Sequence, residues 1–173
     1  MFLLALVMGF LGCIDVSSGF PDGAPIEACI LPQPNRPNHA GTKPLPPHLA
    51  PYSFTASSDS YAPGQPISVQ ISGGPFKGFF VQARDAITND WIGEWVQQDN
   101  NKVFPECSAV THTHPGSKNK VSLTWRAPHG AGSGKVYFIG TILEKYDRYW
   151  SDMKAQVGPR RSGNRSPISP FNF

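Results

Sequence analysis

Short runs in which hydrophobic and polar residues alternate occupy the middle of this chain. In ISVQI (residues 67–71), the isoleucines and the valine fall on one face of an extended segment, and the serine and glutamine fall on the other. A period of two residues is typical of a β-strand with one buried face. The pattern therefore predicts a strand here, and similar runs recur along the chain.

Turn signals rich in glycine and proline separate these runs, and no amphipathic helical period is present. Segment 78–84, GFFVQAR, is strongly apolar, so we expect a central strand there. The pattern predicts an all-β fold, an antiparallel β-sandwich of about eight or nine strands. The candidate strands are 52–56, 67–71, 78–84, 91–96, 109–112, 121–125, 136–143 and 149–155.

Prolines divide the chain into a central part and two flanks. Of the 18 prolines, nine lie between Pro21 and Pro51 and three follow Gly158. Prolines favour extended backbone and remove hydrogen-bond donors, so we expect residues 20–51 to form an extended arm on the surface of the domain. We therefore expect one domain over residues 20–157, followed by a disordered basic tail over 158–173.

The first fourteen residues, MFLLALVMGFLGCI, are apolar but shorter than the roughly 20 residues that cross a bilayer. Small residues follow at Ser17 and Gly19. This arrangement predicts a secretory signal peptide over residues 1–19, cleaved before Phe20; the alternative is an ordinary buried segment. Because no second apolar run of spanning length follows, we expect a soluble extracellular protein without a membrane span.

Secretion changes the interpretation of the three cysteines. Cys13 lies in the predicted signal peptide, which leaves Cys29 and Cys107 in the mature chain. An even number of cysteines in an oxidising compartment favours a disulfide, which would tie the arm to the folded centre. Two free thiols or a two-cysteine metal site are the alternatives, although zinc usually takes four ligands.

Positive charge is concentrated at the C-terminal end of the chain. The formal net charge is +3, and the last fifteen residues contain Arg160, Arg161 and Arg165 without an acidic residue. The centre offers no basic face, so nucleic acid is not an expected partner. Arg160 and Arg161 are candidates for attracting anionic microbial surfaces, against the alternative of a solvated tail. Asn164 begins the one glycosylation sequon, which Pro167 weakens.

Two histidines are the nearest approach to a metal or catalytic site. His112 and His114 lie two residues apart, which would place both on one face of a strand. A third ligand is missing from the pattern, and a polar strand edge with local hydrogen bonds is the alternative. Catalytic serine, zinc-protease and phosphate-binding motifs are absent from the sequence. We therefore expect no enzyme activity, no cofactor and no metal.

Aromatic residues supply both core and candidate contact positions. Trp91 and Trp95 lie four residues apart, so both would share one strand face. We expect Trp95 and Trp125 to pack in the core, whereas Trp91 is a candidate for an exposed surface that stacks on sugar rings. Tyr149 and Trp150 are adjacent, so one should face inward and the other outward.

Eight segments together resemble one known family. In their order and spacing they are similar to the reeler (reelin N-terminal-like) domain, and in particular to the secreted single-domain defence proteins of the noduler group. The resemblance runs from about residue 20 to residue 157. The segments are PDGAPIEAC (21–29), YAPGQPISVQISG (61–73), GFFVQAR (78–84), IGEW (92–95), CSAVTHT (107–113), LTWRAP (123–128), VYFIGTIL (136–143) and YW (149–150).

The resemblance implies an immunoglobulin-like β-sandwich with a disulfide between the positions matched by Cys29 and Cys107. Larger relatives append a DOMON domain and a membrane cytochrome; this chain contains neither, so we expect no haem binding of that kind and no iron reduction. The implied role is innate immune defence by a monomer that binds microbial surface glycans or lipids, or promotes haemocyte aggregation. The alternative is a structural module of the extracellular matrix that binds polysaccharide or protein.

Recognition in such a sandwich would fall to the loops at its ends, because rigid sheets hold variable loops in place. The candidate loops are 85–90, 97–102, 113–120 and 128–135.

Overall fold

The computed structural model describes residues 20–30, 35–37, 39–130 and 132–158. The predicted signal peptide, Arg160, Arg161 and Asn164 lie outside these described residues. Within them, no helix is long and apolar enough to cross a membrane.

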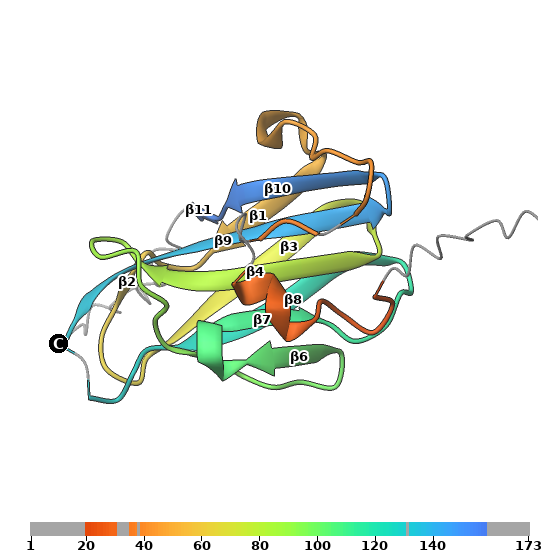
Figure 1. The fold of residues 1–173 in the computed structure, drawn as a ribbon. Helices are drawn as coiled ribbons and strands as arrows, with labels where there is room; N and C mark the ends of the chain where they lie inside the picture. Colours follow the sequence, from red (N-terminus) through yellow and green to blue (C-terminus); the bar gives the residue numbers. More distant parts are fainter. Residues whose placement is uncertain (1–19, 31–34, 38, 131, 159–173) are drawn as a thin grey trace, which may run out of the picture.

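The described chain forms two β-sheets packed face to face, together with three short 3-10 helices (Figure 1). The 3-10 helices are η1 (Ile26–Cys29), η2 (Pro47–Leu49) and η3 (Pro105–Cys107). The strands are β1 (Tyr52–Ala56), β2 (Ser60–Tyr61), β3 (Pro66–Phe76), β4 (Gly78–Asp85), β5 (Glu94–Trp95), β6 (Asn101–Phe104), β7 (Ala109–His112), β8 (Lys118–Arg126), β9 (Gly134–Lys145), β10 (Arg148–Lys154) and β11 (Gln156–Val157).

One sheet has five strands in the order β11-β1-β3-β8-β5. The other has six, in the order β10-β9-β4-β7-β6, with β2 paired to β9. The predicted all-β sandwich is confirmed, and β4 occupies the central position expected from its apolar sequence. Among the described strands, one pair is parallel: β1 with β11.

The main core lies between the two sheets. In β3, Ile67, Val69 and Ile71 are at most 2% exposed, as the alternation of the sequence predicts. Trp125 from β8 makes an edge-to-face contact with Phe138 from β9, with ring centroids 5.7 Å apart. Such a contact joins the two layers and buries a large apolar area. Trp95 and Trp125 are both buried, so their predicted place in the core is confirmed.

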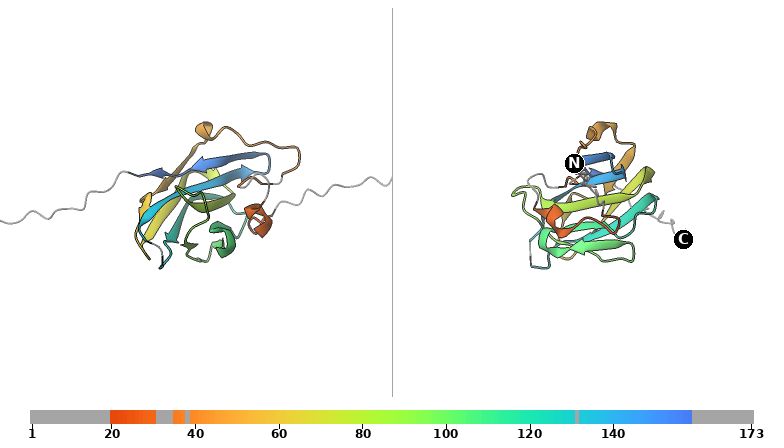
Figure 2. Two further views of the ribbon diagram at one scale, coloured as in Figure 1. Left: turned by 60° about the vertical axis from the view of Figure 1, so that its left-hand side comes forward. Right: turned by 45° about the vertical axis from the view of Figure 1, so that its right-hand side comes forward.

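A second, smaller cluster lies on the outer face of the six-stranded sheet, beneath η1. We call it the outer cluster, and it contains the Cys29–Cys107 disulfide, whose Cα atoms are 6.0 Å apart. The predicted disulfide is therefore confirmed, and it ties the N-terminal arm (residues 20–51) to the sheet. Both views in Figure 2 place η1, drawn red, beside the green segment with β6 and η3. The buried members are Ala28, Cys29, Phe80, Phe104, Cys107 and Ala109.

The predicted continuous strand over residues 91–96 is wrong. Gly93 adopts a φ of 69°, a left-handed conformation that interrupts an extended run, and a β-carbon there would overlap the Trp125 ring. As a result, only Glu94–Trp95 pairs as β5, and Trp91 forms an isolated bridge with Arg84. Trp91 is 42% exposed whereas Trp95 is 6% exposed, so the two do not share a strand face.

Tyr149 and Trp150 face opposite sides of the six-stranded sheet, as expected, but both are 2% exposed. Trp150 packs in the main core. Tyr149 is covered from the other side by the arm: the Leu45 backbone N–H donates to the Tyr149 carbonyl oxygen at 2.8 Å, and the His39 ring lies edge-on against the Tyr149 ring. The arm therefore buries a face of β10 that strand alternation alone would predict to be exposed to solvent.

Strand lengths also differ from the expectation. Eleven strands are described, and β2, β5 and β11 are only two residues long. β6 begins at Asn101, within the predicted loop 97–102. These short pairs are set by contacts with neighbouring strands, which a period read along a single segment does not reveal.

Candidate binding pocket between the arm and the six-stranded sheet

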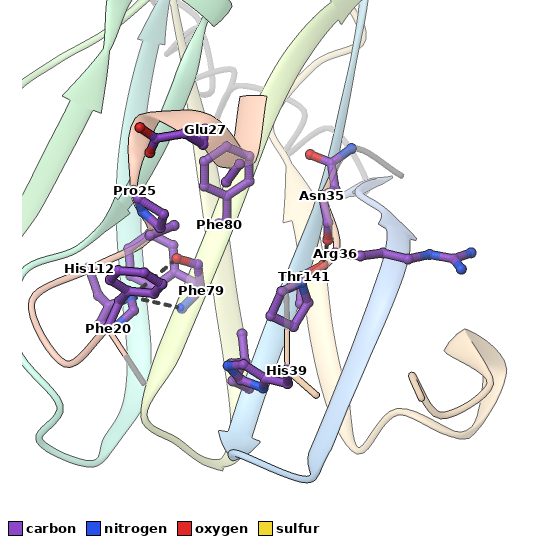
Figure 3. Close-up of a pocket in the computed structure, with 14 residues that line it drawn as sticks. Phe20, Pro25, Glu27, Asn35, Arg36, His39, Phe79, Phe80, His112 and Thr141 are labelled. Atoms are coloured by element: carbon purple, nitrogen blue, oxygen red, sulfur yellow. Dashed lines mark hydrogen bonds between the residues drawn. The ribbon is translucent and has the colours of Figure 1, made fainter. Parts of the chain in front are cut away.

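A cavity of about 450 Å³ opens between the N-terminal arm and the outer face of the six-stranded sheet (Figure 3). Its size lies within the usual range for small-molecule sites. β4, β7 and β9 form its floor, and η1 and residues 35–39 of the arm form its walls where they are described. Apolar side chains dominate the lining: Phe20, Ala24, Pro25, Ala28, Pro37, Phe79, Phe80 and Leu143.

Two contacts hold the first part of the arm against the sheet. Gly23 has a φ of 103° and lies so close to the His112 carbonyl that a β-carbon would not fit. The Ala24 backbone N–H donates to Thr111 Oγ1 at 3.1 Å, and the Thr111 hydroxyl donates to the Phe79 carbonyl at 2.7 Å. With the disulfide at Cys29, these contacts hold the wall of the pocket in place before any ligand arrives.

His112 is a buried, neutral member of the lining. It is 8% exposed, and its Nδ1 accepts a hydrogen bond from the Phe79 backbone N–H at 3.3 Å. Burial lowers the pKa of His112 from its ordinary value of 6.5, and Lys118 and His114 act in the same direction. The Phe79 backbone and Asp22 oppose this shift. At neutral pH the ring therefore brings no charge into the pocket.

Asn35 and Thr141 form the polar end of the pocket. Asn35 is 4% exposed and adopts a φ of 63°, which asparagine tolerates better than most residues. The Thr141 hydroxyl donates to the Asn35 carbonyl oxygen and lies 2.9 Å from Ser151 Oγ. The side-chain oxygen of Asn35, Oδ1, is buried and has no hydrogen-bond partner among the described residues. Figure 3 shows this amide on the opposite side of the pocket from Glu27, with its oxygen turned toward Phe80.

The charged and titratable groups around the pocket are held by other partners or lie at its exposed edge. Figure 3 shows the Arg36 side chain extending away from the pocket, and its Nη2 lies 2.8 Å from Asp152 Oδ2 on β10. His39 stacks on Tyr146, and burial lowers the pKa of His39 below its ordinary value. The Glu27 side chain is at the exposed edge, on η1.

The two predicted histidines are not brought together. β7 ends at His112, and His114 lies beyond it in an exposed turn, where its Nδ1 accepts from the Gly116 backbone N–H at 3.2 Å. Within the described residues, no group of three or more histidine, cysteine or acidic side chains is placed to hold a metal ion. His112 therefore enters the candidate site as a pocket residue, without His114.

The predicted contact residue Trp91 lies away from the pocket lining. The Arg84 guanidinium lies 5.7 Å from the centre of its ring, so one side of the indole faces a cation. Arg160, Arg161 and Asn164 fall outside the described residues, so their proposed roles stay predictions.

Sequence reasoning missed Asn35, Phe80 and Thr141. Asn35 lies in the arm, where there is no periodicity to interpret, and nothing marks it among its neighbouring prolines. Phe80 and Thr141 point outward from strands whose central runs are mostly apolar. The available signal was the apolar character of β4 on both faces, which requires a cover on the outer side of the sheet.

Comparisons with known proteins identify the fold and the family. The reeler domain family model matches residues 27–165. The protein named "Putative defense protein 3" from Antheraea mylitta is 31% identical over 157 residues, which cover 86% of this chain and 91% of that protein. "Ferric-chelate reductase 1" from Bos taurus is also 31% identical, over 87% of this chain but only 26% of its own length.

A solved structure supports the same fold. The crystal structure of the human F-spondin reeler domain (fragment 2) superposes with a TM-score of 0.52 at 22% identity, over 68% of this chain and 89% of that one. The resemblance read from the eight sequence segments is thus confirmed. This chain belongs to the reeler domain family.

Proposed function

We propose that this protein is secreted, acts in innate immune defence and works by binding rather than catalysis. In this proposal it recognises microbial surface components or promotes haemocyte aggregation. The names of its full-length relatives support a role in defence. Family membership supports an extracellular location.

The arm–sheet pocket is the observation that supports binding. The disulfide and the Thr111 contacts hold its walls in place, so little conformational freedom would be lost when a ligand enters. Its apolar lining suits the hydrocarbon part of a microbial amphiphile. We therefore assign recognition first to this pocket, whereas the four predicted loops at the sandwich ends stay candidates.

A binding experiment with two matched variants tests this proposal. The purified protein would be incubated with whole bacteria, lipopolysaccharide, lipoteichoic acid and β-glucan at low and at physiological salt. We expect binding that persists at physiological salt, because an apolar pocket depends little on charge. Leu143→Trp would fill the pocket and abolish binding, whereas Leu49→Trp, at a residue that is 64% exposed and lies outside both the pocket and the candidate loops, would leave it unchanged.

Two results would contradict the proposal. Absence of binding to every microbial component at low salt would exclude microbial recognition. Binding to matrix proteins or host polysaccharide alone, unaffected by Leu143→Trp, would favour the matrix module instead. A parallel haemocyte-aggregation assay with the same two variants would show whether aggregation depends on the same pocket.

A further inference from the structure

The polar inventory of the arm–sheet pocket defines what kind of molecule it accepts. His112 Nδ1 is occupied by the Phe79 backbone, and the Thr141 hydroxyl by Asn35 and Ser151. His39 Nδ1 lies 2.6 Å from the Tyr146 carbonyl oxygen. These atoms therefore have little capacity left for a ligand.

Asn35 Oδ1 is different, because it is a buried acceptor without a partner in the part of the chain that the structure describes. Its residue is 4% exposed and lies in the pocket lining. Leaving such an acceptor unpaired is unfavourable, so native proteins rarely do so without a reason. A ligand that donates one hydrogen bond at this point would remove the penalty.

The charges around the pocket favour a neutral ligand. The Glu27 carboxylate stands on η1 at the edge and would repel an anion. The Arg36 guanidinium is directed to Asp152 on the far side of the arm. His112, with its lowered pKa, adds no positive charge at neutral pH. An anionic group inside would therefore lose its hydration without gaining a counter-ion.

The volume limits the size of the ligand. A space of about 450 Å³ corresponds to roughly fifteen water-sized groups at about 30 Å³ each. A chain of about ten carbons with one polar group fits within it.

From these observations we infer that the pocket binds a neutral, medium-sized apolar molecule with a single hydroxyl or N–H group that donates to Asn35 Oδ1. This inference deepens the proposed function, since it takes the same pocket as the binding site. It identifies the portion of a microbial amphiphile that the pocket would hold: a short uncharged hydrocarbon segment with one hydrogen-bond donor, and no charged headgroup.

Three matched probes test it on the intact mature protein: decan-1-ol, decyl methyl ether and decanoate. Each would displace an apolar fluorescent reporter at pH 7.5. We expect decan-1-ol to bind about tenfold more tightly than the ether, which lacks a donor, and decanoate to bind most weakly. Equal affinity for the alcohol and the ether, tightest binding of decanoate, or binding of none of the probes would each overturn the inference.

Asn35→Gly provides the decisive variant, because glycine accepts the backbone φ of 63° and keeps the carbonyl oxygen that Thr141 contacts. It should remove the preference for the alcohol while leaving the affinity for the ether within twofold. Retention of the preference would show that Asn35 is not the acceptor. Leu143→Trp should block all three probes, and Leu49→Trp should block none. Probe binding unaffected by Leu143→Trp would place the probes elsewhere and overturn the inference.

The outcome is separable from that of the proposed function. Alcohol binding that depends on Asn35, without any binding to microbial components, would overturn the defence role and leave the chemistry of the pocket standing. Microbial binding that is lost in Leu143→Trp, combined with equal affinity for the alcohol and the ether, would support the defence role and overturn the inferred chemistry of the pocket.

Discussion

The two faces of the six-stranded sheet are buried by different means. The inner face packs against a second sheet through residues spaced two apart, such as Val136 and Phe138 on β9. The outer face is covered by an arm without regular strands, held by a disulfide and a few hydrogen bonds. The inner packing is nearly continuous, whereas the outer packing leaves a cavity of about 450 Å³. We therefore expect the inner face to supply most of the stability, whereas the proposed binding site lies on the outer face.

The largest effect is expected from the inner core. Phe138 is 1% exposed and contacts the rings of Trp95 and Trp125. Phe138→Ala should lower the free energy of unfolding by about 3–5 kcal/mol, since it leaves a cavity in close-packed surroundings. Urea unfolding followed by tryptophan fluorescence measures this loss.

Phe80→Ala is the matched substitution on the outer face. Phe80 is 4% exposed and lines the pocket, so it already lacks neighbours on one side. We expect a smaller loss than for Phe138→Ala, because fewer packing contacts are removed. An equal or larger loss would show that the outer cluster stabilises the domain as strongly as the inner core.

The second effect concerns the disulfide that holds the outer cover. Replacing both cysteines, Cys29→Ser with Cys107→Ser, should lower the free energy of unfolding by about 2–4 kcal/mol. Hydrogen exchange locates the change: the Ala24 and Ala28 amides should lose their protection, whereas amides of β3 and β8 should keep theirs. Uniform loss of protection in both regions would mean that the arm and the sandwich unfold as one unit.

A third, smaller effect is a dependence on pH in the outer face. The pKa of His112 is lowered by burial, so the unfolded chain binds the proton more readily than the folded one. The contribution of neutral His112 to the free energy of unfolding is fully present above pH 6.5. It declines as the pH falls below that value, by at most about 1.4 kcal/mol per pH unit for one group. Unfolding measured between pH 7.5 and pH 5 should show this decline.

His112→Gln should flatten that decline, and His39→Gln, whose own pKa is lowered by burial, is the comparison. Both histidines belong to the pocket lining, so both slopes report on the outer face. An unchanged slope in His112→Gln would mean that the ring is as accessible to protons in the folded protein as in the unfolded chain.

The same contrast explains how far the sequence could predict this protein. The period of two in β3 and the apolar run of β4 predicted the sandwich and the central strand, because burial between sheets imposes that pattern. The same pattern predicted that Trp95 and Trp125 pack in the core. The pattern did not predict that the arm covers Tyr149 or that Asn35 is a buried acceptor. An arm of prolines and turns has no periodicity that indicates which residues face inward. The strand predicted over residues 91–96 is wrong for a related reason. Gly93 interrupts it through a left-handed backbone close to the Trp125 ring, and the hydrophobic pattern indicates neither feature.

The smallest effect is expected at an exposed attachment of the arm, the ion pair of Arg36 with Asp152. Its nitrogen and oxygen lie 2.8 Å apart, but the side chains are 38% and 42% exposed. Solvent screens such a pair, so Asp152→Asn should cost no more than about 1 kcal/mol, and asparagine accepts the φ of 59° at this position. The cost should shrink between about 0.05 M and about 1 M NaCl.

Asp147→Asn is the control for this last substitution, since Asp147 pairs with Lys145 only two residues away and holds no distant segment. Both substitutions remove one exposed charge, but only Asp152→Asn should speed hydrogen exchange at Arg36. Equal exchange in the two variants would mean that this ion pair does not hold the arm to the sheet. A large and salt-independent loss in Asp152→Asn would instead mean that the outer face depends on this pair as the inner face depends on Phe138, and the contrast between the two faces would fail.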